Sequence, residues 1–137
     1  MDQYTFNKVN WLEAKDDLSF IRTRVFIEEQ SVPVELEWDK HDESCIHLLV
    51  LSRDKAVATA RIQKNGHIGR MAVLKEHRHH GIGSAMLDIL IEYCHEHKLR
   101  PHLDAQIEAI KFYQKKGFNI ISEEFLDAGI PHKSMEI

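Results

Sequence analysis

Residues 78–85, with the sequence RHHGIGSA, have the composition of an anion-binding loop. They follow an apolar segment at residues 67–74 and precede a run with helical spacing, so Gly81 and Gly83 stand where a helix begins. Glycines let the backbone approach a ligand closely, and the N–H groups and dipole of a helix N-terminus favour negative charge. With Arg78 as an added cation, the segment predicts a phosphate or pyrophosphate site. A tight turn without a ligand is the alternative.

Two common phosphate-binding loops do not match this segment. A Walker loop requires Gly-Lys followed by Ser or Thr, which the chain lacks here. A dinucleotide fingerprint requires a third glycine where Met86 stands, and its strand opens a βαβ unit, whereas the strand here belongs to a predicted hairpin. A nucleotide-binding domain is therefore disfavoured.

The hairpin brings a second set of chemically interesting residues together. Asn65 and Gly66 favour a two-residue type I′ turn between strands at residues 56–63 and 67–74. Counting back along both strands from such a turn places Arg61 directly opposite Arg70.

Two arginines facing each other are unfavourable unless an anion lies beside them. The anion can be internal, namely a carboxylate of the acidic segment at residues 30–45, of Glu28 or of Glu29. It can instead be an acidic group of a substrate, which would make Arg61 and Arg70 a substrate-binding clamp. Both interpretations stay open from the sequence.

The elements that position these residues alternate along one unbroken domain, residues 1–137. Asn10, with Glu13 three residues later, forms a helix-capping box. The patterns predict helices at residues 11–29, 81–97 and 107–118. They predict strands at residues 3–9, 46–52, 56–63, 67–74 and 100–106, and a closing pair within residues 118–129 and 131–137.

Composition limits the classes of function. The chain has 137 residues with a net charge of -4, which disfavours non-specific binding to nucleic acid and points to a small-molecule partner. No apolar run approaches the ~20 residues that cross a bilayer, so we expect no membrane association. Cys45 and Cys94 are isolated, which fits a reducing cytoplasm. The ten histidines lack helical i, i+4 spacing, so we expect no metal site.

Several segments resemble one superfamily. RHHGIGSA resembles the R/Q-x-x-G-x-G/A signature of the GNAT acyltransferases, and residues 109–118, AIKFYQKKGF, resemble their A-x-x-F-Y-x-x-x-G-F segment. The stretches VFIEEQSVP, DAQ and DAGIPHKSM are similar to an ElaA-like branch of small bacterial N-acetyltransferases. The resemblance implies an α/β (α+β) GNAT fold: a mixed, mostly antiparallel sheet flanked by helices and splayed at the strand that ends in Val73.

The resemblance also implies acetyl-CoA as the acyl donor, and it assigns residues to binding it. The pyrophosphate would be held by Arg78, His79, His80, Gly81, Ile82, Gly83, Ser84 and Ala85. The pantetheine arm would pair with Met71, Ala72 and Val73, and an amide on Val73 would polarise the thioester carbonyl. Ala109 and Phe112 would flank the cofactor, and Gln106 stands where many members carry Asn.

Acyl transfer from a thioester needs a neutral amine, stabilisation of the developing negative charge and a proton for the departing thiolate. The resemblance assigns that proton to Tyr113. The candidate general bases are Glu28, Glu29, His41, His47, Asp104 and His132. Glu29 and His132 rank slightly ahead because they lie in the branch-like stretches, and a chain of waters without a single base is equally open.

The expected activity is transfer of an acetyl group from acetyl-CoA to a primary amine of a small molecule or peptide, by direct attack without a covalent intermediate. The alternative is a sensory or regulatory module that binds coenzyme A without turnover. The identity of the acceptor stays open, and so does the choice between a monomer and a homodimer.

Overall fold

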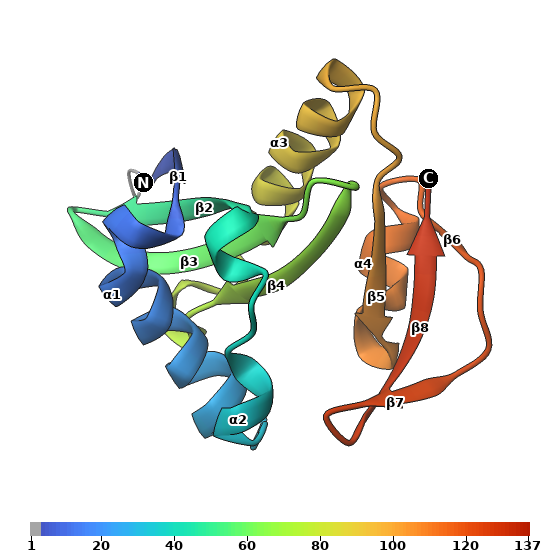
Figure 1. The fold of residues 1–137 in the computed structure, drawn as a ribbon, viewed down its shortest axis with the longest axis horizontal. Coiled ribbons are helices and arrows are strands. Elements are labelled where there is room, and N and C mark those ends of the chain that lie inside the picture. Colours follow the sequence, from blue (N-terminus) through green and yellow to red (C-terminus); the bar gives the residue numbers. More distant parts are fainter. Residues whose placement is uncertain (1–3) are drawn as a thin grey trace.

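One mixed sheet of eight strands runs through residues 4–137, the part of the chain that the computed structural model describes (Figure 1). Gln3, the first residue of the first predicted strand, lies outside the described residues. The strands are β1 (Tyr4–Val9), β2 (Ile46–Ser52), β3 (Lys55–Ile62), β4 (His67–Val73), β5 (His102–Gln106), β6 (Asn119–Ile120), β7 (Phe125–Asp127) and β8 (Ile130–Glu136). The helices are α1 (Trp11–Arg22), α2 (Val34–Glu37), α3 (Ile82–Glu96) and α4 (Ile110–Gln114).

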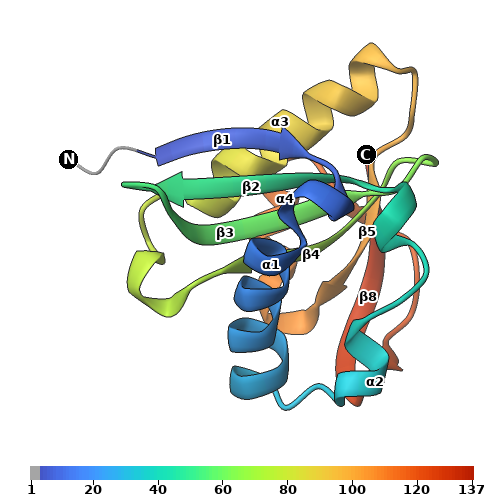
Figure 2. The same cartoon turned by 60° about the vertical axis from the view of Figure 1, so that its left-hand side comes forward.

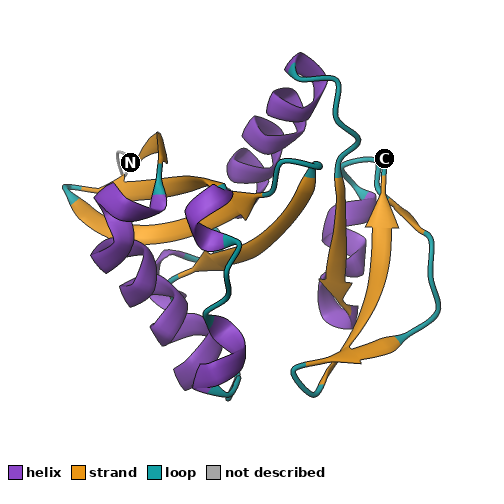
Figure 3. Ribbon diagram, viewed as in Figure 1, coloured by secondary structure: helices purple, strands orange, loops and turns teal. Residues whose placement is uncertain are grey.

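The strand order confirms the predicted mixed, mostly antiparallel sheet. It runs β1-β2-β3-β4-β5-β8-β6, with β7 paired to β8, and only the β4–β5 pair is parallel. Helices cover both faces of the sheet (Figures 2 and 3). Leu18 and Ile21 of α1 pack on one face, and Met86 and Leu90 of α3 pack on the other.

The helix predicted at residues 11–29 is confirmed, and its capping box forms as expected. The Glu13 N–H donates to the Asn10 side chain, and the Asn10 N–H donates to the Glu13 carboxylate. After Arg22 the helix continues as a π-helix over Thr23–Glu29. The segment predicted as a loop at residues 30–45 contains the short helix α2. The helix predicted at residues 107–118 is shorter, with a 3₁₀ turn before α4.

The predicted register of the β3–β4 hairpin is wrong by one residue near the turn. The Gln63 N–H donates to the His67 carbonyl, and the Gly66 N–H donates to the Gln63 carbonyl. The loop therefore has three residues rather than two, and Gly66, at φ 93°, takes the left-handed conformation that closes it. As a result Arg61 lies opposite Gly69 and not opposite Arg70.

A bulge in β4 then restores the register further along. Thr59 pairs with Ala72, whereas Arg61 pairs with Gly69, so Arg70 and Met71 together face one residue of β3. Arg70 has a positive φ of 49°, as a bulged residue can. A bulge bends its strand and re-aims the side chains around it.

Beside this bulge, β4 and β5 separate. They pair only at His67–His102 and Ile68–Leu103, and Figure 1 shows the two strands diverging beyond these pairs. From Gly69 to Val73, no strand in the described part of the chain pairs with β4 on the β5 side. The predicted splay at the strand that ends in Val73 is therefore confirmed.

Candidate active site

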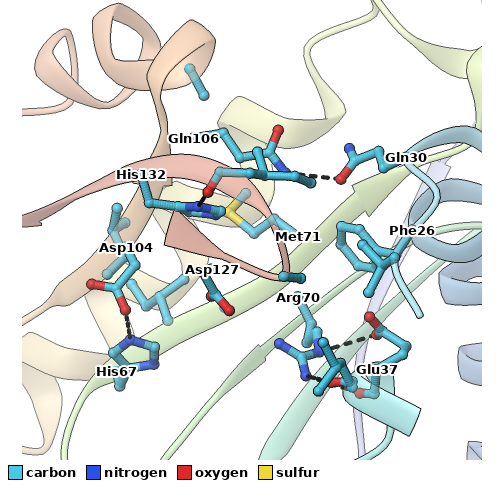
Figure 4. A pocket seen from close by; sticks show the side chains of 18 of the residues that line it. Phe26, Gln30, Glu37, His67, Arg70, Met71, Asp104, Gln106, Asp127 and His132 are labelled. Atoms are coloured by element: carbon cyan, nitrogen blue, oxygen red, sulfur yellow. Dashed lines mark hydrogen bonds and ion pairs between the residues drawn. The ribbon is translucent and has the colours of Figure 1, made fainter. Parts of the chain in front are cut away.

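A cavity of about 250 Å³ opens where β4 and β5 diverge (Figure 4). The bulged segment of β4 forms one wall, and β5 with the β7–β8 hairpin forms another. Its polar lining residues are Gln30, Glu37, His67, Arg70, Asp104, Gln106, Tyr113, Asp127 and His132. Its apolar lining includes Phe26, Val32, Leu36, Ile68, Met71 and Leu103.

The glycine-containing loop has the backbone conformation of an uncapped helix start. Gly81, the residue before α3, lies in the left-handed region at φ 79°, and no side chain caps the helix. The first-turn N–H groups of Ile82, Gly83 and Ser84 therefore remain available for a ligand, because the first N–H groups of a helix have no partner within it. His79 and His80 are exposed on the approach to this helix end.

The two motif segments meet in space. A Cβ atom at Gly83 would lie 3.7 Å from Cζ of Phe112 in α4, which is an ordinary contact distance. Gly83 also has no positive φ, so nothing in the protein itself requires glycine there. A ligand that lies close to the backbone at Gly83 would explain why glycine stands there, because it would leave no room for a side chain.

Arg78 links the helix start to β4. Its Nε donates to the Val73 carbonyl at 2.9 Å, and its Nη2 forms an ion pair with Glu29 Oε1 at 2.7 Å. The sequence had placed Arg78 at a phosphate and Glu29 among the general bases. The structure places Glu29 beside Arg78 and outside the cavity lining. The third guanidinium nitrogen, Nη1, has no partner among the described residues.

Tyr113 reaches from α4 to the bulged strand. Its hydroxyl donates to Met71 Sδ at 3.7 Å, and its ring packs edge-on against Phe112 and Phe118. Burial raises the pKa of Tyr113 to about 12. The hydroxyl therefore stays protonated at every pH where the protein would work, as a proton donor must.

Of the two base candidates ranked first, His132 is the one in the cavity. Its ring is buried, and Nδ1 lies 2.7 Å from the Ile130 carbonyl. Because a carbonyl can only accept, Nδ1 carries a hydrogen, and the tautomer with that hydrogen on Nδ1 has Nε2 as its acceptor. Asp104 also lines the cavity, where it accepts from the Ser134 hydroxyl at 2.6 Å and lies 3.6 Å from His67 Nε2.

The other base candidates lie outside the cavity lining. Glu28 pairs with Arg24 on the surface, and the buried ring of His47 is bonded to the Asp42 carbonyl. His41 lies in the segment between α2 and β2 and does not line the cavity. Gln106 does line it, and its Nε2 donates to Gln30 Oε1 at 2.9 Å, which ties β5 to the end of the long helix.

The two arginines of the hairpin share carboxylates of the acidic segment. Arg61 is 4% exposed and binds Asp39 at 2.7–2.8 Å and Asp42 at 2.8 Å. Arg70 binds Glu37 at 3.1 Å and Asp39 at 3.3 Å. The internal ion pair, one of the two interpretations from the sequence, thus describes Arg61, which does not line the cavity. Arg70 does line it, because the bulge re-aims its side chain.

This ion network is closed by a third arginine, Arg22, which binds Glu37 at 2.8 Å and Asp42 at 2.7 Å. Its guanidinium also contacts the rings of Trp11 and Trp38, with 5.4 and 4.9 Å to the ring centroids. Three arginines and three carboxylates thus fix the acidic segment against β3 and β4. That arrangement holds Glu37 at the cavity.

Several lining residues were missed by sequence reasoning. Glu37 lay in a segment assigned to a loop, and Asp127 lay in the closing strands without a motif. His67 was seen only as the first residue of a strand. Burial lowers the pKa of His67, against the opposing effect of Asp104, so its ring is neutral at neutral pH. The only feature of the sequence that could have marked these three residues as part of the cavity was an ionisable side chain within an otherwise apolar or turn-rich segment.

Within residues 4–137 no group of three histidine, cysteine or acidic side chains is arranged to hold a metal ion. Across the same residues no helix has the length and apolarity needed to traverse a bilayer. Cys45 and Cys94 are both free and buried.

The fold and the site define an acyltransferase-type architecture, and comparison with known proteins identifies the family. Residues 7–137 match the acetyltransferase (GNAT) domain family. The chain therefore belongs to the GNAT acetyltransferases.

Individual relatives agree with this assignment. The chain is 37% identical over 128 residues to the N-acetyltransferase YjcF of Bacillus subtilis, covering 90% of this chain and 91% of YjcF. It is similar to the crystal structure of Escherichia coli ElaA, with a TM-score of 0.85, 28% identity and 99% of each chain covered. An acyl-CoA N-acyltransferase from Pseudomonas aeruginosa gives a TM-score of 0.86 at 25% identity, again with 99% of each chain covered. The ElaA-like resemblance seen in the sequence is confirmed.

Proposed function

We propose that the protein transfers an acetyl group from acetyl-CoA to a primary amine of a small molecule or peptide by direct attack of the amine. The observation that carries this proposal is the arrangement along the β4–β5 divergence. There, within residues 4–137, an uncapped helix start is followed by a strand edge without a partner and by a cavity lined by the half-buried Tyr113. The relatives' names, N-acetyltransferase and acyl-CoA N-acyltransferase, support the same reaction.

The residues present fit coenzyme A. Gly81 and the first turn of α3 would hold the pyrophosphate through Ile82, Gly83, Ser84 and Ala85, with Arg78 Nη1 as a further donor that has no partner among the described residues. His79 and His80 would flank it. Met71, Ala72 and Val73 would pair with the pantetheine arm because that edge of β4 has no strand partner. Ala109 and Phe112 would lie alongside the arm.

Acetyl-CoA would supply the activated acetyl thioester, and the protein would supply positioning and protons. The Val73 N–H would donate to the carbonyl oxygen as negative charge develops on it. The Tyr113 hydroxyl, now bonded only to a weak sulfur acceptor, is free to donate to the departing sulfur instead.

The amine must lose a proton, and His132 is the residue we propose to take it. Its Nδ1–H is committed to the Ile130 carbonyl, so Nε2 can accept. Asp104 or a chain of waters in the cavity could relay that proton onward. Glu29, held by Arg78, would act on the cofactor side by fixing the arginine.

The test is release of free thiol from acetyl-CoA against a panel of amines, polyamines, amino acids and peptides. Release that depends on the amine, with acetylated amine as the second product, is the expected result. Binding of acetyl-CoA without release in the presence of any amine would identify a coenzyme A-binding module instead.

A further inference from the structure

The cavity lining carries an excess of negative charge. Its ionisable side chains include three carboxylates, Glu37, Asp104 and Asp127, and a single guanidinium, Arg70. The charge of Glu37 is balanced by Arg22 and Arg70, so the excess rests on Asp104 and Asp127. His67 adds no positive charge at neutral pH, because burial lowers its pKa. A cavity of one sign of charge attracts ligands of the opposite sign.

The positive charge of Arg70 is already shared with protein carboxylates. Its Nε lies 3.1 Å from Glu37 Oε2, and its Nη2 donates to the Glu37 carbonyl at 2.9 Å and lies 3.3 Å from Asp39 Oδ2. Among residues 4–137, Nη1 has no partner, and Nε makes no hydrogen bond although it lies within ion-pair distance of Glu37. The protein's own carboxylates therefore largely neutralise Arg70, which the sequence had allowed as part of a clamp for an acidic substrate group.

Glu37 has a buried side chain, and one of its carboxylate oxygens has no donor in the described part of the chain. The side chain is 3% exposed, and Oε2 accepts from Arg22 Nε at 2.8 Å and faces Arg70. Its other oxygen, Oε1, has no hydrogen-bond partner in the described part of the chain, and Glu37 lines the cavity (Figure 4). A buried carboxylate oxygen is stabilised by a donor, most strongly by a charged one.

Asp127 offers a second unpaired carboxylate on the opposite wall. It ends β7, and within residues 4–137 its side chain makes neither an ion pair nor a hydrogen bond. Asp104, by contrast, is engaged by Ser134 and His67. Figure 4 shows Asp127 between the His67–Asp104 pair and the Arg70–Glu37 pair.

We propose that the acceptor is an aliphatic diamine or polyamine, whose second, protonated nitrogen is held by Glu37 Oε1 and Asp127. This inference rests on the proposed acetyl transfer and names the acceptor's chemical class. The reacting nitrogen must be neutral to attack, whereas the second nitrogen stays protonated and matches the carboxylates. The apolar side chains of the lining, Phe26, Val32, Leu36, Ile68 and Leu103, suit the methylene chain between the two nitrogens.

The test compares three four-carbon amines that differ only at the far end: putrescine, n-butylamine and γ-aminobutyrate. We expect kcat/KM to be about tenfold higher for putrescine than for n-butylamine, mainly through KM, and lowest for γ-aminobutyrate. Equal kcat/KM for putrescine and n-butylamine, or a preference for γ-aminobutyrate, would overturn the inference while leaving amine acetylation intact. Failure of all three and of the wider panel to release thiol would refute the proposed function itself.

Two variants and one control locate the effect. Asp127→Asn should lower the preference for putrescine over n-butylamine about fivefold, because the exposed hairpin keeps its fold while losing a charge. Glu124→Gln, an exposed carboxylate outside the lining, should keep that preference. Glu37→Gln should lower the preference as Asp127→Asn does, with thermal unfolding measured alongside because Glu37 is part of the buried ion network. A preference unchanged in Asp127→Asn would contradict the inference.

Discussion

Replacing Tyr113 by phenylalanine removes the proposed proton donor and little else. The hydroxyl makes one hydrogen bond, to Met71 Sδ at 3.7 Å, which is a weak acceptor. Phenylalanine keeps the ring contacts with Phe112 and Phe118. We therefore expect the free energy of unfolding of Tyr113→Phe to stay within about 1 kcal/mol of the wild type.

The expected effect on catalysis is much larger. Loss of a general acid typically costs on the order of 100-fold or more in rate, equivalent to about 2.7 kcal/mol. With the pKa of Tyr113 at about 12 and a reference thiol near ~8.5, full proton transfer to the thiolate is uphill by about 5 kcal/mol. We therefore expect Tyr113 to assist the departing thiolate through a hydrogen bond that strengthens as charge grows on the sulfur. Complete proton transfer before the bond to sulfur breaks is disfavoured.

The assay is steady-state thiol release at saturating amine, with binding of acetyl-CoA measured separately by calorimetry. We expect kcat to fall about 100-fold in Tyr113→Phe, while the affinity for acetyl-CoA changes little. Tyr93→Phe, on α3 and outside the cavity, serves as the matched control. Because Tyr113 stays protonated, its ionisation should cause no loss of wild-type activity below about pH 11. A variant that keeps at least half of the wild-type kcat, or that loses only affinity for acetyl-CoA, would refute the assigned role.

Three further predictions concern other parts of the site. Arg78→Ala should weaken acetyl-CoA binding about tenfold and reduce its salt dependence, whereas Arg100→Ala, in the segment between α3 and β5, should not. Equal affinities of the two variants in calorimetry would remove the phosphate assignment. Arg61→Gln should lower the free energy of unfolding by about 3 kcal/mol because it removes the nearest partner of Asp39 and one of the two partners of the buried Asp42. Loss of the exposed Arg24 pair should cost less than about 0.5 kcal/mol; urea unfolding measures both, and similar losses would contradict the buried network. His132→Gln should lower kcat about 100-fold without changing affinity for acetyl-CoA, and wild-type turnover in this variant would exclude it as the base.

The local structure around residues 78–85, which we propose to bind the cofactor, could be predicted because its signals are local. The strand before the loop, the glycine at the helix start and the helix itself are adjacent in sequence, so composition and periodicity were sufficient. Gly81 takes a left-handed conformation at the helix start, a detail that the prediction did not specify. The splay beside Val73 followed from the family resemblance rather than from periodicity.

The side of the cavity near Arg70, where we propose that the acceptor binds, could not be predicted in the same way. A two-residue turn and a three-residue turn are both compatible with Asn65-Gly66, and the difference moved Arg61 away from Arg70. The bulge at Arg70 leaves no mark in the alternation of polar and apolar residues, yet it decides which arginine faces the cavity.

Glu37 and Asp127 reach the cavity through long-range packing. Glu37 is held there by Arg22 and Arg70, which lie 15 residues before it and 33 after it. Asp127 arrives because the β7–β8 hairpin folds back beside β5. Tertiary contacts of this kind are set by the whole fold, so single-sequence patterns contain no direct signal for them.

The central claim, acetyl transfer to an amine, is tested most directly by following both products of one reaction. The purified protein is incubated with acetyl-CoA and putrescine, and free coenzyme A and acetylated putrescine are quantified by mass spectrometry. Amine-dependent formation of the two products in equal amounts is the predicted result. Binding of acetyl-CoA with neither product formed, for putrescine and for every other amine offered, would contradict it.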